Sequence, residues 1–454
     1  HAKDRRQRQM CIRDRLSASL VTQDAIERAK AVNTKLNAIT VENFDLAQTN
    51  SEKPFTGFFQ GVPTFIKDTD EVPGLPLYLG SRSLPGEPSD KYSKAAKQII
   101  DTGLNCLGTT TTPEFGLTGT TESLRFGATC NPWNTAYSTG GSSGGSSALV
   151  ASGVIPIAHA NDGAGSIRIP ASCCGLVGLK ASRGRIKDKE VPSYLPANIL
   201  HDGVVTRSVR DTWAFHAEIE KNIPATEFPP IGDISESFPK NLKIAVLTEN
   251  CLGEDSSAEL VQATHDVARL CESLGHEVEM ISNPFYKKFD EDFWLLWAHF
   301  GFLIRYSVGK ELSSKFDHTQ LEQWPKYLIS RHWRNIHKVP VAFWRLRRFV
   351  SQYETFMQNF DILLTPTLGT TVPKLGFFGP EVSGQEHWER INDFLPFTKY
   401  QNISGAPAIT LPCGTDLKGL PIGIQLSSRL GEDRLLLKLS LQLEQNSNWK
   451  SLNK

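Results

Sequence analysis

Apolar residues are distributed along the chain in short continuous runs that alternate with longer stretches of helical spacing. The segments 61–67, 105–108 and 242–247 have the length and apolar content of buried strands. Apolar residues at helical spacing occur at 93–102 and at 258–274. This alternation predicts an α/β fold in which a central β-sheet is covered by helices on both faces.

A different pattern follows between 285 and 350, where helical spacing is combined with a high content of aromatic residues. We interpret this segment as an inserted helical cap, and we expect it to wall a large apolar pocket suited to apolar or aryl ligands. The alternative is that the rings only pack the interior of a helical subdomain. The candidate substrate-binding residues in the cap are Trp297, Trp324 and Trp333.

Composition and charge exclude several classes of function. The 454 residues include 49 Lys and Arg against 49 Asp and Glu, so net charge favours neither nucleic acid nor an anionic surface as a partner. The eight cysteines lack metal-binding spacing and no HExxH motif is present, so we predict free thiols, no metal and no cofactor. No apolar run is long enough to span a membrane and no signal peptide is evident, which favours a cytoplasmic enzyme.

The first fifteen residues do not fit the rest of the chain. The segment 10–15, Met-Cys-Ile-Arg-Asp-Arg, resembles one reading frame of a sequencing-library adapter. We therefore expect residues 1–15 to be a non-native segment whose deletion leaves folding and activity unchanged. Residues 16–454 are expected to form one large domain, because no Pro- and Ser-rich linker or block of charge divides them.

Candidate chemistry is concentrated in two serine-rich glycine loops joined by a stretch of small residues. The first loop reads Gly-Gly-Ser-Ser-Gly-Gly at 140–145, and the second reads Gly-Ala-Gly-Ser-Ile-Arg at 163–168. Glycines on both sides of a serine let the backbone turn tightly, and they let a substrate carbonyl approach bare N–H groups. Together the loops offer a serine nucleophile with an oxyanion cradle and a second hydroxyl that can move protons.

A base for such a nucleophile is offered by Lys67, which ends the apolar run at 61–67. If that run is a buried strand, the amine is partly desolvated, and desolvation lowers the pKa of a lysine because it disfavours the charged form. A neutral amine can then accept a proton near neutral pH. Pairs of serine and lysine are a recognised variant of the serine nucleophile. The alternative for Lys67 is a solvated residue at the end of a strand.

The order Lys67, Ser142, Ser166, with separations of 75 residues (67 to 142) and 24 residues (142 to 166), is similar to that of the amidase signature family. The motif Gly-Ser-Ile-Arg-Ile-Pro-Ala-Ser that contains Ser166 also follows the family pattern. Further blocks that resemble the family are found at 174–180, 361–367, 404–409 and 423–425.

For the fold, the resemblance implies the amidase-signature architecture, a central mixed β-sheet covered by helices on both faces. Within 16–454, we expect a catalytic core at 61–190, the helical cap at 285–350 and a C-terminal return of sheet and helix at 361–445. A homodimer is common among such enzymes and stays open as the oligomeric state.

For the site, the resemblance implies that Ser166 attacks the substrate carbonyl. Ser142, in a cis peptide linkage, relays the proton, and Lys67 is the base at the end of the relay. Asp162 is expected to hold the second loop by pairing with Arg168. The backbone N–H groups expected to hold the oxyanion are those of Gly163, Ala164, Gly165 and Ser166.

Three residues around these positions carry open alternatives. Ala164 stands where the family usually has glycine, and its methyl group is harmless unless its φ is positive. Gly141 and Ser143 are candidates for substrate contact, while the alternative for Ser143 is a structural hydrogen bond.

The first loop also satisfies the G-x-S-x-G pattern of α/β-hydrolase esterases, in which Ser142 is the nucleophile. That motif must lie between a strand and a helix, whereas 131–139 has the composition of a loop. Such an esterase also needs a histidine downstream of the serine, for which His201 and His387 are candidates without a distinguishing context. We regard this alternative as the weaker one.

The substrate class is narrowed by the segments 158–163 and 173–175, which resemble the branch that contains aminohexanoate cyclic-dimer hydrolases. We therefore expect small-molecule amides with apolar, aryl or oligoamide character, with carbamates and esters open as further substrates. The alternative is the amidase-type component of a glutamine amidotransferase, which works in a complex with other proteins and usually carries glutamine where Ile169 stands. A second alternative is a binding protein without catalytic activity.

Overall fold

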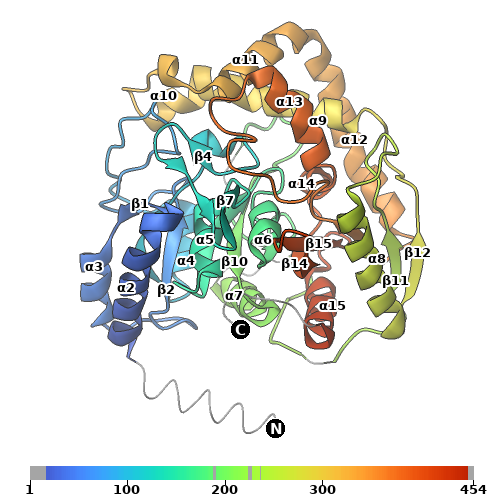
Figure 1. Ribbon diagram of the computed structural model, residues 1–454, viewed down its shortest axis with the longest axis horizontal. Coiled ribbons are helices and arrows are strands. Elements are labelled where there is room, and N and C mark those ends of the chain that lie inside the picture. Colours follow the sequence, from blue (N-terminus) through green and yellow to red (C-terminus); the bar gives the residue numbers. More distant parts are fainter. Residues whose placement is uncertain (1–16, 188–190, 223–226, 236, 448–454) are drawn as a thin grey trace.

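A computed structural model of the chain describes residues 17–187, 191–222, 227–235 and 237–447 (Figure 1). The segment 1–15, expected to be non-native, lies outside the described residues. The centre of the fold is an eight-stranded sheet with parallel and antiparallel pairs. In spatial order its strands are β12 (Glu277–Met280), β11 (Lys243–Val246), β13 (Ile362–Pro366), β15 (Pro421–Ser427), β14 (Ala408–Thr415), β9 (Val177–Lys180), β10 (His201–Thr206) and β8 (Ile157–Asp162).

Helices cover both faces of this sheet, and the side chains of β11 show why. Ile244 and Val246 pack into one apolar cluster, whereas Ala245 between them packs into the cluster on the opposite face. A strand buried on both faces is continuously apolar, so the sequence run at 242–247 is explained and the predicted fold class is confirmed. One face is covered by α7 (Val209–Asn222), α8 (Ala258–Ser273) and α15 (Asp433–Asn446), and the other by α6 (Arg168–Cys174), α12 (Val339–Met357) and α14 (Lys399–Ser404).

The helix α6 lies very close to the sheet because small residues meet at its contact. A Cβ added at Gly423 of β15 would lie 2.5 Å from the hydroxyl oxygen of Ser172 on α6, so no larger residue fits there. This close approach sets the position of the loop that precedes α6, which carries Ser166.

A second, three-stranded sheet brings the predicted base to the edge of the main sheet. Its strand β2 (Pro63–Lys67) is fully buried and runs parallel to β3. The hydroxyl of Thr64 donates a 3.0 Å hydrogen bond to the carbonyl of Ile157 on β8, which joins the two sheets. The other elements of this layer are β1 (Ile39–Glu42), β3 (Asn105–Thr110), α2 (Ala18–Leu36), α3 (Phe44–Ser51) and α4 (Lys94–Ile100), which confirm the predicted helix at 93–102 and strand at 105–108.

The segment 285–350 folds into helices that lie together at the top of the view in Figure 1. They are α9 (Phe289–Leu303), a π-helical turn η2 (Ile304–Val308), α10 (Gly309–Leu312), η3 (His318–Gln320), α11 (Gln323–Asn335), η4 (Ile336–Lys338) and α12, with α13 (Gly384–Phe394) packed beside α11. The indole N–H groups of Trp297 and Trp324 both donate 2.9 Å hydrogen bonds to the carbonyl of Leu117. This carbonyl follows the short turn η1 (Glu114–Gly116), so the cap is tied to the loop layer below it.

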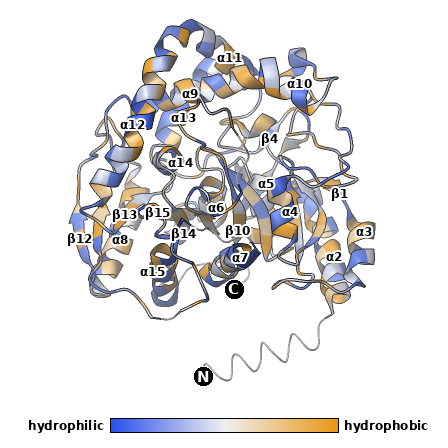
Figure 2. Cartoon of the chain, turned by 180° about the vertical axis from the view of Figure 1, so that it is seen from behind, coloured by the Kyte–Doolittle hydropathy of each residue, from blue (hydrophilic) through white to orange (hydrophobic). Residues whose placement is uncertain are grey.

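Hydrophilic and hydrophobic residues alternate along the outer helices in Figure 2, as expected of helices that bury one face. The helix α8 shows this in detail, since Leu260, Thr264, Ala268 and Cys271 are its buried residues and recur at helical spacing. None of the helices in the described part of the chain has the length and apolar character that a membrane crossing requires.

The prediction that residues 131–139 form a loop is wrong. The segment forms a polar hairpin in which β7 (Asn134–Ser138) pairs with β6 (Cys130–Asn131). Side-chain hydrogen bonds stabilise it, because the Asn131 amide donates to the carbonyls of Ser138 and Cys173. The hairpin carries few apolar residues, so its sequence lacks a strand signal. The remaining elements are β4 (Glu122–Ser123), β5 (Gly127–Ala128) and α5 (Gly144–Ala151).

Candidate active site

Lys67 lies at the end of β2 and is completely buried. Its Nζ atom lies 2.7 Å from Ser142 Oγ and 2.6 Å from Asn161 Oδ1. Its backbone N–H donates to Nδ1 of His159 on β8. The strand pairing thus places the amine against the first glycine loop, and the alternative of a solvated strand end does not apply.

Ser142 lies just before α5, and the peptide bond between Gly141 and Ser142 is cis. The sequence-based expectation that Gly141 and Ser143 contact substrate does not fit the geometry. Gly141 packs against the backbone of Thr120, and Ser143 is fully buried with its hydroxyl bonded to the backbone of Asn161. Ser143 therefore ties the first loop to β8.

The second loop is folded around the carboxylate of Asp162. This carboxylate accepts hydrogen bonds from the backbone N–H groups of Gly165 (2.7 Å) and Ile167 (3.2 Å), and from Nε and Nη2 of Arg168 (2.9 Å each). Burial alone would raise the pKa of Asp162, but the Arg168 guanidinium overcomes this effect and holds the pKa well below its usual range. The expected pairing of Asp162 with Arg168 is present.

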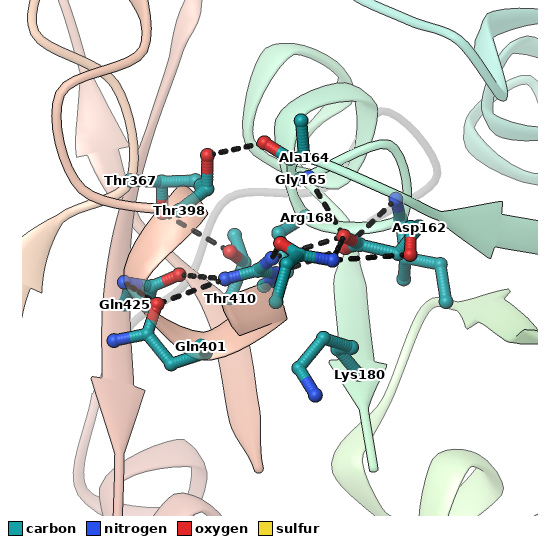
Figure 3. A network of polar contacts seen from close by, with 12 residues as sticks. Asp162, Ala164, Gly165, Arg168, Lys180, Thr367, Thr398, Gln401, Thr410 and Gln425 are labelled. Carbon is teal, nitrogen blue, oxygen red and sulfur yellow. Dashed lines mark hydrogen bonds and ion pairs between the residues drawn. The ribbon is translucent and has the colours of Figure 1, made fainter. Parts of the chain in front are cut away.

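The C-terminal part of the chain supplies the other partners of Arg168, as Figure 3 shows. Its Nη1 atom donates to Gln425 (2.7 Å) on β15 and to Gln401 (3.2 Å) on α14, and its Nη2 atom donates to Asn402 (2.6 Å). Sequence reasoning gave none of the three this role and included only Gln425 in a block that resembles the family, because no local pattern marks a side chain that binds more than 230 positions away.

The backbone of the second loop offers fewer oxyanion donors than the sequence suggests. Gly165 has φ of 122°, and its N–H is engaged by Asp162, so its expected role in the oxyanion hole is corrected. Within the part of the chain that the structure describes, the N–H groups of Gly163, Ala164 and Ser166 have no hydrogen-bond acceptor. The carbonyl of Ala164 is fixed by the hydroxyl of Thr398 at 2.6 Å (Figure 3).

Ser142, Ser166 and Asn161 line one cavity of about 370 Å³. Trp297 also lines it and faces Gly163, since a Cβ at Gly163 would lie 3.3 Å from the indole ring. Further apolar walls come from η1 with the residue after it, from the cap and from other loops, and they include Phe115, Leu117, Phe300, Ile304, Val308, Leu79, Val191 and Leu200.

The structure does not bring the other two candidate tryptophans to the cavity wall. Trp324 is buried behind Leu117 and stacks on His387, with ring centroids 3.9 Å apart. Trp333 is 50 % exposed on the outer side of α11, where it packs edge-on against Phe302. Trp324 and Trp333 lie on the same helix but point to opposite sides of it. The aromatic content of the segment alone does not reveal this difference.

Two observations decide against Ser142 as an esterase nucleophile. The first loop does lie between a strand and a helix, but β7 belongs to a two-stranded hairpin outside the main sheet. The partner of Ser142 is Lys67, not a histidine. His201 also lines the cavity, and burial lowers its pKa well below the ordinary value. His387 lies on α13, bonded to Thr118.

Among the described residues, Asp70, His159 and Asp202 place potential metal-ligand atoms within 4.8 Å of one another. The hydrogen bonds of the His159 imidazole explain why these atoms lie close together. Because Nδ1 of His159 accepts the N–H of Lys67, the proton resides on Nε2, which lies 3.1 Å from Asp202 Oδ1. A protonated Nε2 is a hydrogen-bond donor and not a metal ligand.

Comparison with known proteins decides the family. The model of the family described as Amidase matches residues 20–437. The chain belongs to the amidase signature family. A putative amidase, AmiC of Mycobacterium tuberculosis, is 41 % identical over 96 % of this chain and 92 % of its own length. The 6-aminohexanoate-cyclic-dimer hydrolase of Paenarthrobacter ureafaciens is 32 % identical, with the same coverage.

The fold agrees with this membership. A solved structure of 6-aminohexanoate cyclic dimer hydrolase superimposes with a TM-score of 0.87 and 31 % identity, covering 98 % of this chain and 96 % of the other. This amidase is therefore an enzyme of a family that hydrolyses amide bonds, and the mixed sheet with helices on both faces is the fold of that family.

Proposed function

We propose that the protein is a serine amidase in which Ser166 is the nucleophile, Ser142 relays the proton and Lys67 is the base. The observation that carries the proposal is the 2.7 Å contact between Lys67 Nζ and Ser142 Oγ at the wall of a cavity that Ser166 also lines. A buried amine beside a buried hydroxyl is the arrangement that proton transfer from a serine requires.

In this mechanism, Ser166 Oγ attacks the amide carbonyl carbon while its proton passes to Ser142, whose own proton passes to Lys67. The negative charge on the carbonyl oxygen is held by the backbone N–H groups of Gly163, Ala164 and Ser166. When the tetrahedral intermediate collapses, the carbon–nitrogen bond breaks and the relay returns the proton to the leaving nitrogen. Water then attacks the acyl-enzyme by the same route and releases the carboxylic acid.

The walls of the cavity support apolar, aryl or oligoamide substrates. The rings of Phe115, Trp297 and Phe300 line it, and burying an aromatic or aliphatic group there removes apolar surface from water. The relative named for the cyclic dimer of 6-aminohexanoate acts on an oligoamide of this character, which supports the same class here. Carbamates and aryl esters present the same carbonyl chemistry to Ser166, and we propose them as secondary substrates.

The test is hydrolysis of five compounds by the purified protein: a linear aliphatic amide, an aryl anilide, the cyclic aminohexanoate dimer, an aryl carbamate and glutamine. We expect turnover of the anilide or the cyclic dimer, and its loss in both Ser166→Ala and Lys67→Ala. Ser147→Ala, which removes a buried hydroxyl from α5 away from the cavity, is the matched control and should remain active.

Turnover of glutamine alone would replace the proposal with the glutamine amidotransferase alternative, against which the Ile169 position argues. Undiminished turnover by Ser166→Ala would contradict the assignment of the nucleophile. Absence of any turnover by the wild type would favour a binding protein without catalytic activity.

A further inference from the structure

Asn161 lies on β8 and lines the cavity, and its side chain is bonded to the same Lys67 amine that contacts Ser142. Its Oδ1 atom accepts a 2.6 Å hydrogen bond from Lys67 Nζ, while its Nδ2 atom donates a 2.6 Å hydrogen bond to Thr69 Oγ1. The Thr69 hydroxyl in turn donates to Asp70 Oδ2 at 2.9 Å. Four residues therefore form one continuous line of hydrogen bonds that ends at the amine.

The order of donors and acceptors along this line of hydrogen bonds is fixed by Asp70. The Asp70 carboxylate accepts from Thr69 and, through its other oxygen, from the hydroxyl of Ser93. Because the Thr69 proton points at Asp70, only a lone pair of its oxygen faces Asn161, and the amide must present its NH₂ group there. Its carbonyl oxygen is consequently turned toward Lys67.

The fixed carbonyl oxygen of Asn161 determines how the neutral amine of Lys67 is oriented. A neutral lysine has two N–H bonds and one lone pair on Nζ, and it can rotate about its last C–N bond. One N–H is taken by Asn161 Oδ1, which restricts that rotation. The lone pair can then face Ser142 Oγ across the 2.7 Å contact, where it receives the proton of the relay.

We propose that Asn161 is a positioning residue, held by Thr69 and Asp70, that aims the lone pair of Lys67 at Ser142 and sets the proton affinity of the amine. This inference rests on the proposed serine, serine and lysine mechanism. It assigns to a residue that the sequence did not single out a role in tuning the base. The acceptor also favours the charged amine, because a hydrogen bond to an ionised group stabilises that form.

Other titratable groups surround the amine and stay constant in the test. One aspartate directly follows Lys67, and a second aspartate lies in the next turn. A histidine lies on the adjacent strand β8, and a third aspartate lies on β10. These groups are Asp68, Asp70, His159 and Asp202. Substitution of Asn161 leaves them in place, so a change in pH dependence is attributable to the substituted side chain.

The test compares the pH dependence of kcat/KM on an aryl anilide for the wild type, Asn161→Asp and Asn161→Leu. The acid limb of this profile reports the group that must lose a proton in the free enzyme. Asn161→Asp places a carboxylate against the amine, so the limb should move up by about one pH unit or more. Asn161→Leu removes the acceptor, so the limb should move down while the plateau of kcat/KM, and kcat with it, falls about tenfold.

Thr69→Val provides a second variant that keeps Asn161. Loss of the Thr69 hydroxyl frees the amide to turn, so we expect kcat to fall more than KM changes, which a purely spatial role in the cavity wall would not produce. Ser93→Ala removes the other hydroxyl from Asp70 and should leave the acid limb in place. Thermal melting of each variant confirms that it is folded.

The outcomes separate the two proposals. If Lys67→Ala remains active, the base is misassigned and the proposed mechanism fails. If Lys67→Ala is inactive but both Asn161 variants keep the wild-type limb and kcat, the mechanism stands and the role of Asn161 is overturned. Shifts of the limb in the same direction in both variants would also overturn it.

Discussion

The backbone N–H of Glu322 donates a 2.7 Å hydrogen bond to the carboxylate of Glu114. Glu114 begins the η1 turn beneath the cavity, and Glu322 is the residue that precedes the cap helix α11. The carboxylate of Glu322 in turn accepts the backbone N–H of Leu124 at 2.7 Å. Two buried acids therefore fasten the cap to the layer that carries the cavity wall.

These acids predict a pH dependence of stability. Burial raises the pKa of Glu114 from 4.5 to about 7, and burial together with the Glu114 charge raises that of Glu322 from 4.5 to about 8. Between pH 4.5 and the raised pKa values, the folded protein binds more protons than the unfolded chain. The contribution of the two carboxyl groups to stability is therefore complete below pH 4.5 and is lost as the pH rises to 8.

The substitution Glu322→Gln keeps the acceptor for Leu124 and removes the ionisation. We expect it to raise the Tm relative to the wild type at about pH 8.5 and to give little or no gain at about pH 5. One pKa unit corresponds to about 1.4 kcal/mol, so the difference should be readily measured by thermal melting at the two pH values. An equal effect at both pH values would contradict the shifted ionisation.

The loop that carries Ser166 predicts opposite responses at two adjacent positions. Gly165 has φ of 122°, and an added Cβ would lie 2.6 Å from the hydroxyl oxygen of Thr398, so Gly165→Ala should distort the loop and reduce kcat at least tenfold. Ala164 is not among the residues with positive φ, so Ala164→Gly should change kcat less than about threefold. Steady-state kinetics of both variants on one anilide checks this, and similar losses in the two would refute it.

The two tryptophans that share the Leu117 carbonyl predict a separation of binding from stability. Each substitution to Phe removes one hydrogen bond, worth about 1 kcal/mol, so Trp297→Phe and Trp324→Phe should lower the Tm to a similar extent. Only Trp297 lines the cavity, so only Trp297→Phe should raise KM for an aryl anilide, by about threefold to tenfold. A comparable rise in KM for Trp324→Phe would contradict the assigned cavity wall.

The buried pair of Arg168 and Asp162 predicts a large structural effect. Arg168→Met leaves the carboxylate without its cation, which typically destabilises a protein by about 3–5 kcal/mol. We expect a clear decrease in the urea midpoint and loss of turnover. Arg347→Met, which removes a surface guanidinium that contacts the Tyr194 carbonyl, is the control and should have a small effect. Equal midpoints for the two variants would show that the buried pair does not hold the loop.

Much of the architecture could be predicted because burial on both faces of a strand leaves a direct record in the sequence. The run at 242–247 is apolar throughout for that reason, and the helix at 258–274 carries one buried stripe. The polar hairpin of β6 and β7 was missed because its strands are stabilised by the Asn131 side chain and expose most of β7. A pattern of apolar residues cannot report such a strand.

The site was predictable as far as its chemistry depends on residue type and spacing. Lys67 and the two loop serines could be named from the sequence; Lys67 contacts Ser142, and both serines line the cavity. The bond between the Gly165 N–H and Asp162 depends on the direction of the backbone, which the sequence does not show. Trp297 is buried while Trp333 is exposed because the cap helices present different sides to the protein, and this too is decided only in the folded chain. The partners of Arg168 come from elements that meet it only in three dimensions.

The contacts of Arg168 have a consequence for biosynthesis. Residue 168 is synthesised long before Gln401, Asn402 and Gln425. The side chains of these three later residues nevertheless hold the guanidinium that shapes the Ser166 loop. The growing polypeptide therefore carries the three residues of the proposed relay while it still lacks the side chains that hold their loop in place. We therefore expect a polypeptide interrupted between residues 168 and 401 to be inactive and not a partly active enzyme.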